Sequence, residues 1–89
     1  MDETIEHRCL RIFREIVSLQ NPGLISAWDD DRLLTEPLEA IDIDSMSRLD
    51  YVMRVESAYN VELDEADVNA CGTIREFAAL VTVVVAASK

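Results

Sequence analysis

Apolar residues recur at intervals of three and four along three long stretches of the chain. In the first stretch the pattern runs from Ile5 to Leu19, and this spacing is typical of an amphipathic helix. Pro22 and Gly23 end it, because proline cannot continue the hydrogen-bond ladder and glycine permits a turn. The predicted helices, of which the third is short, cover about residues 2–20, 45–59, 64–69 and 73–86.

Two of these helices have recognisable starts. Thr73 and Glu76 form a capping box, in which the threonine oxygen accepts from an amide and the glutamate side chain reaches back. The helix over residues 45–59 has two candidate N-caps, Asp44 and Ser45. The β-branched run at 81–85 favours a strand locally. We keep it helical because the chain offers it no partner strand.

The connection between the first two long helices, residues 21–44, is unusually long for a compact domain. We expect it to lie as a loop across the helices, because it contains apolar residues that need cover. These are Leu24, Ile25, Leu33, Leu34, Leu38, Ile41 and Ile43. The chain is therefore predicted to be a single all-α domain over residues 1–89, with three longer helices, one short helix and a long loop.

The helix over residues 45–59 carries two apolar faces. One contains Val52, Val55 and Tyr59, with Tyr51 near it. The second is a stripe at spacings of three and four, formed by Met46, Leu49 and Met53. If only one face packs inside, the other is an exposed contact surface. The alternative is that both belong to an ordinary core.

Charge is the strongest feature of the composition. The 89 residues carry 8 Lys or Arg and 18 Asp or Glu side chains, a net charge of −10. This disfavours nucleic acid and anionic membrane surfaces, which attract basic proteins. It favours partner proteins with basic surfaces. The N-terminus has no signal-peptide pattern, and the most apolar stretch, 77–87, is too short to span a bilayer. We therefore expect a cytoplasmic protein.

The sequence offers little material for catalysis or metal binding. There is one histidine, His7, and the two cysteines, Cys9 and Cys71, are far apart, so no zinc site is expected. We expect two buried free thiols, although a disulfide stays open. An EF-hand counted from Asp42 fails, because the sixth residue is not glycine and the twelfth is not glutamate. We expect no enzyme and no bound metal.

Ser45 lies at the predicted start of an acidic helix, next to Asp44. As an isolated feature it is a simple helix cap. A phosphate ester attached at this position, however, would be stabilised by the helix dipole and by free backbone amides.

The segment around Ser45 resembles a known family. The run over residues 35–46, TEPLEAIDIDSM, is similar to the attachment motif of acyl carrier proteins. Ile41, Asp44, Ser45 and Met46 fit that motif, and Asp42 stands where the family usually has glycine. Segments after this run, including the start of the last helix, also resemble the family in order. The likeness covers residues 33–81.

The resemblance implies a four-helix acyl-carrier-like bundle and a specific role. Ser45 would receive 4'-phosphopantetheine from coenzyme A through a Mg-dependent phosphopantetheinyl transferase. The arm would hold acyl groups as thioesters and present them to partner enzymes, such as ketosynthases or acyltransferases of fatty-acid, polyketide or related specialised biosynthesis. The carrier itself would be non-catalytic and is expected to be a monomer.

The resemblance also implies a partner-binding surface on the helix that follows Ser45. Carboxylates would meet basic partner groups, and the methionine-containing stripe would adapt to several partners. The expected residues are Asp44, Met46, Leu49, Asp50, Met53 and Glu56. Arg48 and Arg54 place positive charge on this helix and suggest a specialised carrier. A peptidyl or aminoacyl carrier of a nonribosomal pathway and an unmodified carrier-like interaction domain remain as alternatives.

Overall fold

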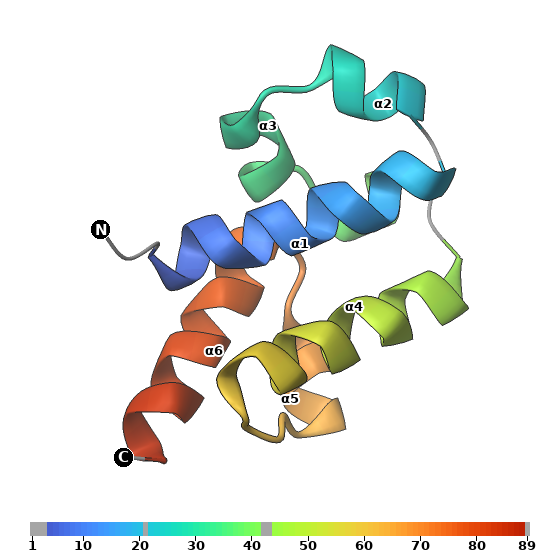
Figure 1. Ribbon diagram of the computed structural model, residues 1–89. Helices are drawn as coiled ribbons and strands as arrows, with labels where there is room; N and C mark the ends of the chain where they lie inside the picture. The colour runs from blue at the N-terminus through green and yellow to red at the C-terminus, as the bar shows by residue number, and fades with distance from the viewer. Residues whose placement is uncertain (1–3, 21, 42–43, 89) are drawn as a thin grey trace.

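The computed structural model describes residues 4–20, 22–41 and 44–88, and these residues form helices and turns without any strand. The all-α prediction is confirmed: the described residues contain the three longer helices and the short one before the last helix, together with two further short helices that were not predicted (Figure 1). The elements are α1 (Ile5–Gln20), α2 (Pro22–Ala27), α3 (Asp30–Thr35), the 3-10 turn η1 (Leu38–Ala40), α4 (Ser45–Tyr59), α5 (Glu65–Ala70) and α6 (Ile74–Ala87).

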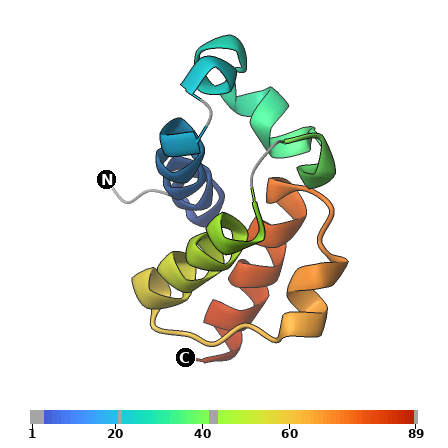
Figure 2. The ribbon, with the colours of Figure 1, turned by 90° about the vertical axis from the view of Figure 1, so that its right-hand side faces the viewer.

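Helix α1 lies at the centre of the arrangement. It contacts α2, α3, α4 and α6, while α6 also contacts α3 and α5. Figures 1 and 2 show α2 and α3 on one side of α1 and the three later helices on the other.

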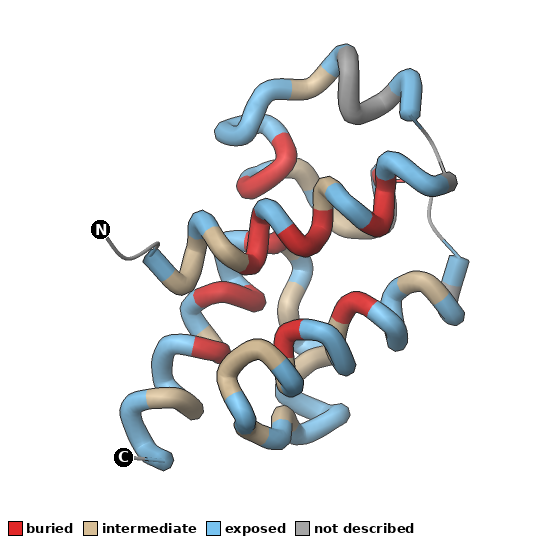
Figure 3. Tube along the Cα trace, in the orientation of Figure 1, coloured by how far each residue is buried: buried red, intermediate tan, exposed pale blue. Residues whose placement is uncertain are grey.

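The core lies where α1, α4 and α6 face one another (Figure 3). Tyr51 of α4 joins all three, because its ring lies 5.2 Å from the ring of Phe13 and 5.2 Å from the ring of Phe77, centroid to centroid. Its hydroxyl donates to the carbonyl of Cys9 over 2.9 Å.

The apolar pattern of the first helix placed Leu19 with the residues of its buried face. The structure corrects this, because Leu19, in the last turn of α1, is exposed.

The connection over residues 21–44 is not the loop that the sequence predicted. Pro22 begins α2 instead of only ending α1, because a proline at the first helical position loses no hydrogen bond that a helix would use. Asp29 caps α3 by accepting from the Arg32 amide over 2.9 Å. Because Pro22 and Gly23 were interpreted as a helix end and six residues give no clear apolar period, the pattern missed α2 and α3.

The expectation that this connection buries its own apolar residues is confirmed where the structure describes them. Leu33, Leu34 and Ile41 are buried, and Leu38 packs partly buried against them. The expectations for the side chains of Leu24, Ile25 and Ile43 lie outside the described residues.

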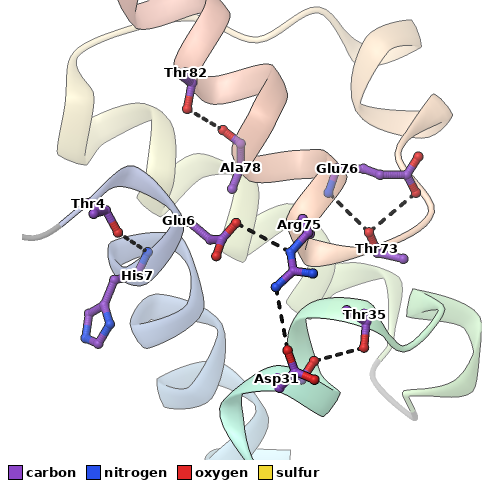
Figure 4. A network of polar contacts seen from close by, with 10 residues as sticks. All are labelled: Thr4, Glu6, His7, Asp31, Thr35, Thr73, Arg75, Glu76, Ala78 and Thr82. Carbon is purple, nitrogen blue, oxygen red and sulfur yellow. Dashed lines mark hydrogen bonds and ion pairs between the residues drawn. The ribbon is translucent and has the colours of Figure 1, made fainter.

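Acidic residues of the connection make ion pairs with neighbouring helices. Asp30 accepts from Arg14 of α1 over 2.6 Å. Arg75 of α6 lies between Glu6 and Asp31, at 3.6 Å and 3.7 Å, and so joins three helices (Figure 4). Exposed ion pairs contribute little each, about 0–1 kcal/mol. Two carboxylates of this acidic run, those of Asp30 and Asp31, are therefore paired with arginines of α1 and α6.

Helix α6 begins as the capping box predicts. The Thr73 hydroxyl oxygen accepts from the Glu76 amide over 3.1 Å, and Glu76 reaches back to the amide of Gly72 over 3.1 Å. The β-branched run at 81–85 is helical, and Val81 within it is fully buried. Within the described residues, no helix is long and apolar enough to cross a membrane.

Both cysteines are free thiols. Burial raises the pKa of the Cys9 thiol to about 11, so it is protonated near neutral pH. Cys71 is only partly buried, contrary to expectation, because it lies just after the short helix α5, where its thiol donates to the Asp67 carbonyl over 3.4 Å. Burial raises the pKa of this thiol as well. Neither group has the lowered pKa of a reactive cysteine.

Candidate functional site

The start of α4 is organised by Asp44. Its backbone is extended, its carboxylate accepts from the Ser47 amide over 2.7 Å, and its carbonyl accepts from the Arg48 amide over 3.1 Å. Asp44 is therefore the N-cap. Ser45 is the first residue of the helix, so the interpretation of Ser45 as the cap is wrong. The reason is that Asp44 supplies both the extended backbone and the accepting side chain that a cap requires.

One face of α4 is exposed and apolar. Tyr51 and Val55 point into the core, whereas Met46, Leu49 and Met53 are 79%, 61% and 57% exposed. The alternative that this stripe is ordinary core is thereby excluded. The stripe begins at the residue after Ser45 and continues for two turns along the helix, so any group attached at Ser45 has an apolar contact surface beside it.

The carboxylates that were expected to meet partners on α4 have partners within the chain. Asp50 accepts from the Arg54 guanidinium over 3.1 Å, four residues on. Glu56 accepts from the Leu63 amide over 2.8 Å and so holds the turn after α4. Helix α4 carries two arginines, one aspartate and one glutamate, and its charges therefore cancel.

Negative charge is concentrated instead on the segment that leads into α5. The exposed acidic residues there are Glu62, Asp64, Glu65 and Asp67. Asp64 also caps α5 by accepting from the Ala66 amide over 2.8 Å. Sequence reasoning placed the partner-binding charge on α4 and missed this segment. Counting charge for each predicted helix would have found it.

A groove of about 450 Å³ runs between α4 and α5. Its apolar lining comes from Leu49, Val52, Leu63 and Val68, and its charged lining from Arg48, Glu56 and Glu65. Beneath it lies a cavity of about 30 Å³, also lined by Arg48, Val52 and Val68. The groove was not predicted, because it depends on how α5 docks beside α4.

A comparison with family models matches residues 23–81 to the phosphopantetheine attachment site. This span covers more than half of the chain and includes the start of α4, the exposed stripe and the groove. The chain belongs to this family. No curated protein and no solved structure matches the carrier domain.

The cofactor of this carrier domain is 4'-phosphopantetheine, which is attached covalently. The residues at the start of α4 fit such a group. An anion at this end is favoured by the dipole of a 15-residue helix, and the cap leaves Ser45 unused as a capping residue. Arg48 adds a positive side chain one turn further along.

Proposed function

We propose that this carrier domain is modified at Ser45 and holds acyl groups as thioesters for partner enzymes. The observation that supports it most is the place of Ser45, which is the first residue of α4 inside the matched segment. Ser57 lies at the opposite end of the same helix, where the dipole disfavours an anion. Ser47 is half-buried, and its amide is bonded to Asp44.

The chemistry of attachment follows from the hydroxyl. In the proposed reaction the Ser45 oxygen forms a bond to the β-phosphorus of coenzyme A, and adenosine 3',5'-bisphosphate leaves. The hydroxyl proton passes to a base on a Mg-dependent phosphopantetheinyl transferase. The attached arm ends in a thiol that carries the acyl group as a thioester. Asp44 keeps the helix start rigid, and so fixes where the Ser45 backbone is offered to the transferase.

The proposed partner surface combines the stripe on α4 with charge on either side. Met46, Leu49 and Met53 would enter an apolar patch on the partner. Asp44 and the acidic segment 62–67 would face basic groups at its edge. Asp50 and Glu56 belong to this surface in position, but their carboxylates are already bonded within the chain. A partner would therefore gain less from them than the sequence predicted.

The neutral charge of α4 favours a specialised carrier over one that serves ordinary fatty-acid synthesis. Polyketide and related specialised pathways are the acyl systems we propose, and an aminoacyl or peptidyl carrier would share the same attachment serine.

We further propose a single-domain monomer over residues 1–89 that works in the cytoplasm, where free thiols such as Cys9 and Cys71 persist.

The proposal predicts that the unmodified protein gains one acyl-phosphopantetheinyl group at Ser45 from an acyl-coenzyme A through the transferase, and that neutral hydroxylamine removes the acyl part. Hydroxylamine cleaves the thioester to a hydroxamate and frees the thiol, whereas an amide survives. Intact mass spectrometry before and after treatment measures this. The Ser45→Ala protein, which keeps both thiols, is the control for acylation of Cys9 or Cys71. An acyl group that resists hydroxylamine, or that appears equally on the control, would contradict the proposal.

A further inference from the structure

Arg48 is unlike the other arginines of the chain. Within the described residues it has no ion pair, no side-chain hydrogen bond and no contact with an aromatic ring. The other arginines each have such a partner: Arg11, Arg14, Arg32, Arg54 and Arg75 pair with carboxylates, and Arg8 lies over the ring of Tyr59. In a chain with a net charge of −10, a guanidinium with neither a carboxylate nor an aromatic ring as partner is unexpected.

The position of Arg48 relates it to Ser45. The two residues are three apart on α4, and residues at this spacing share one face of a helix, with Cβ atoms about 5–6 Å apart. Arg48 also lines both the groove between α4 and α5 and the small cavity beneath it. Arg48 therefore lies between Ser45 and the groove, and the groove has room for an arm attached to Ser45.

The charges along the groove favour an anion at only one end of it. Arg48 is the one positively charged residue among those that line the groove in the described part of the chain. Glu56 lines it about two turns further along α4, Glu65 lines it from α5, and both repel an anion near them. An anion beside Ser45 is attracted, whereas an anionic cargo deeper in the groove is not.

The distance along the arm decides which anion Arg48 meets. A phosphodiester on Ser45 begins at the serine oxygen itself, and residues three apart share one face of a helix. The thiol and its cargo are at the other end of a long arm. A guanidinium offers two donors in a fork that matches phosphate oxygens.

We propose that Arg48 is a positioning residue that ion-pairs with the phosphodiester on Ser45 and turns the arm toward the groove between α4 and α5. This inference rests on the attachment at Ser45 proposed above. Arg48 is exposed, so the pair is weak, and its loss changes the population of arm conformers by a factor of roughly two to five.

The test compares Arg48→Gln and Arg48→Lys with Arg54→Gln as the matched control. Arg54 is the other arginine of α4, it is bonded to Asp50, and it does not line the groove. Each protein is prepared unmodified and modified, with the product checked by intact mass and the fold by circular dichroism. The readout is the change in the amide resonances of Val52 and Val68 on modification, together with the phosphorus resonance of the arm.

We expect clear changes at Val52 and Val68 in the parent and in Arg54→Gln. They should fall about two- to five-fold in Arg48→Gln and recover in part in Arg48→Lys, which keeps the charge. The phosphorus resonance should move in Arg48→Gln and stay in Arg54→Gln. Equal behaviour of the two glutamine variants in fully modified protein would overturn the role of Arg48 and leave the proposed function standing.

Two further outcomes separate the remaining explanations. Modified protein loaded with a dicarboxylic acyl group tests whether Arg48 instead meets a carboxylate of the cargo. An effect of Arg48→Gln that is seen only with that cargo would overturn the proposal. A parent protein that is not modified at Ser45 would overturn both this inference and the proposed function.

Discussion

Replacing Tyr51 with alanine is expected to lower the free energy of unfolding by about 3–5 kcal/mol, the usual cost of truncating a buried aromatic residue. Tyr51 is 5% exposed, and its ring contacts Phe13 of α1 and Phe77 of α6. Small domains have only about 5–15 kcal/mol of stability in total. The variant should therefore unfold at a much lower urea concentration, measured by circular dichroism.

The phenylalanine variant separates the ring of Tyr51 from its hydroxyl. Tyr51→Phe keeps both ring contacts and removes only the hydrogen bond to the Cys9 carbonyl. Leaving a buried acceptor without its donor costs about 1–3 kcal/mol, so this variant should lie between the parent and Tyr51→Ala. If the two variants were equally destabilised, the ring would not be the junction of α1, α4 and α6.

Alanine at Leu49 and Met53 together is expected to reduce kcat/KM of a partner enzyme by about tenfold or more, without lowering the unfolding midpoint. Exposed apolar side chains cost the fold little when truncated, whereas a buried anchor in a docked complex contributes more than about 1 kcal/mol, and 1.4 kcal/mol corresponds to a factor of ten. A broad-specificity phosphopantetheinyl transferase with coenzyme A supplies the partner reaction.

Val83→Ala is the matched control for that double variant. Val83 is exposed to a similar degree, 66%, but it lies on α6, away from the proposed docking stripe. Its kcat/KM should equal that of the parent. A similar loss in Val83→Ala would show a general effect of apolar surface. A lowered unfolding midpoint in the Leu49 and Met53 variant would place the stripe in the fold instead of the interface.

The sequence predicted the long helices well because their apolar residues repeat over several turns. Helix α4 begins at Ser45 and ends at Tyr59, as the pattern indicated. Its two apolar faces were visible as two sets of spacings, but which of them is buried depends on the packing of α1 and α6 against it. Helix α5, with six residues, was predicted, whereas α2 and α3 of the same length were missed. Pro22 and Gly23 were interpreted as a helix end, and the few apolar residues of the connection gave fewer than two turns of pattern.

The candidate site was predictable in its attachment residue and less so in its surroundings. Asp44 and Ser45 could be picked out as the start of a helix and by their likeness to a family motif. The hydrogen bond from the Leu63 amide to the Glu56 carboxylate joins positions seven residues apart across a turn. No local sequence pattern predicts it. The isolation of Arg48 is equally non-local, because it depends on where every nearby carboxylate finds its own partner.

Intact mass spectrometry after transferase treatment tests the central claim most directly. The parent, Ser45→Ala and Ser47→Ala proteins are each incubated with coenzyme A, Mg and a broad-specificity phosphopantetheinyl transferase, after circular dichroism has shown that each is folded. We expect one phosphopantetheinyl group on the parent and on Ser47→Ala, and none on Ser45→Ala. A group gained by Ser45→Ala, or none gained by the folded parent, would contradict attachment at Ser45.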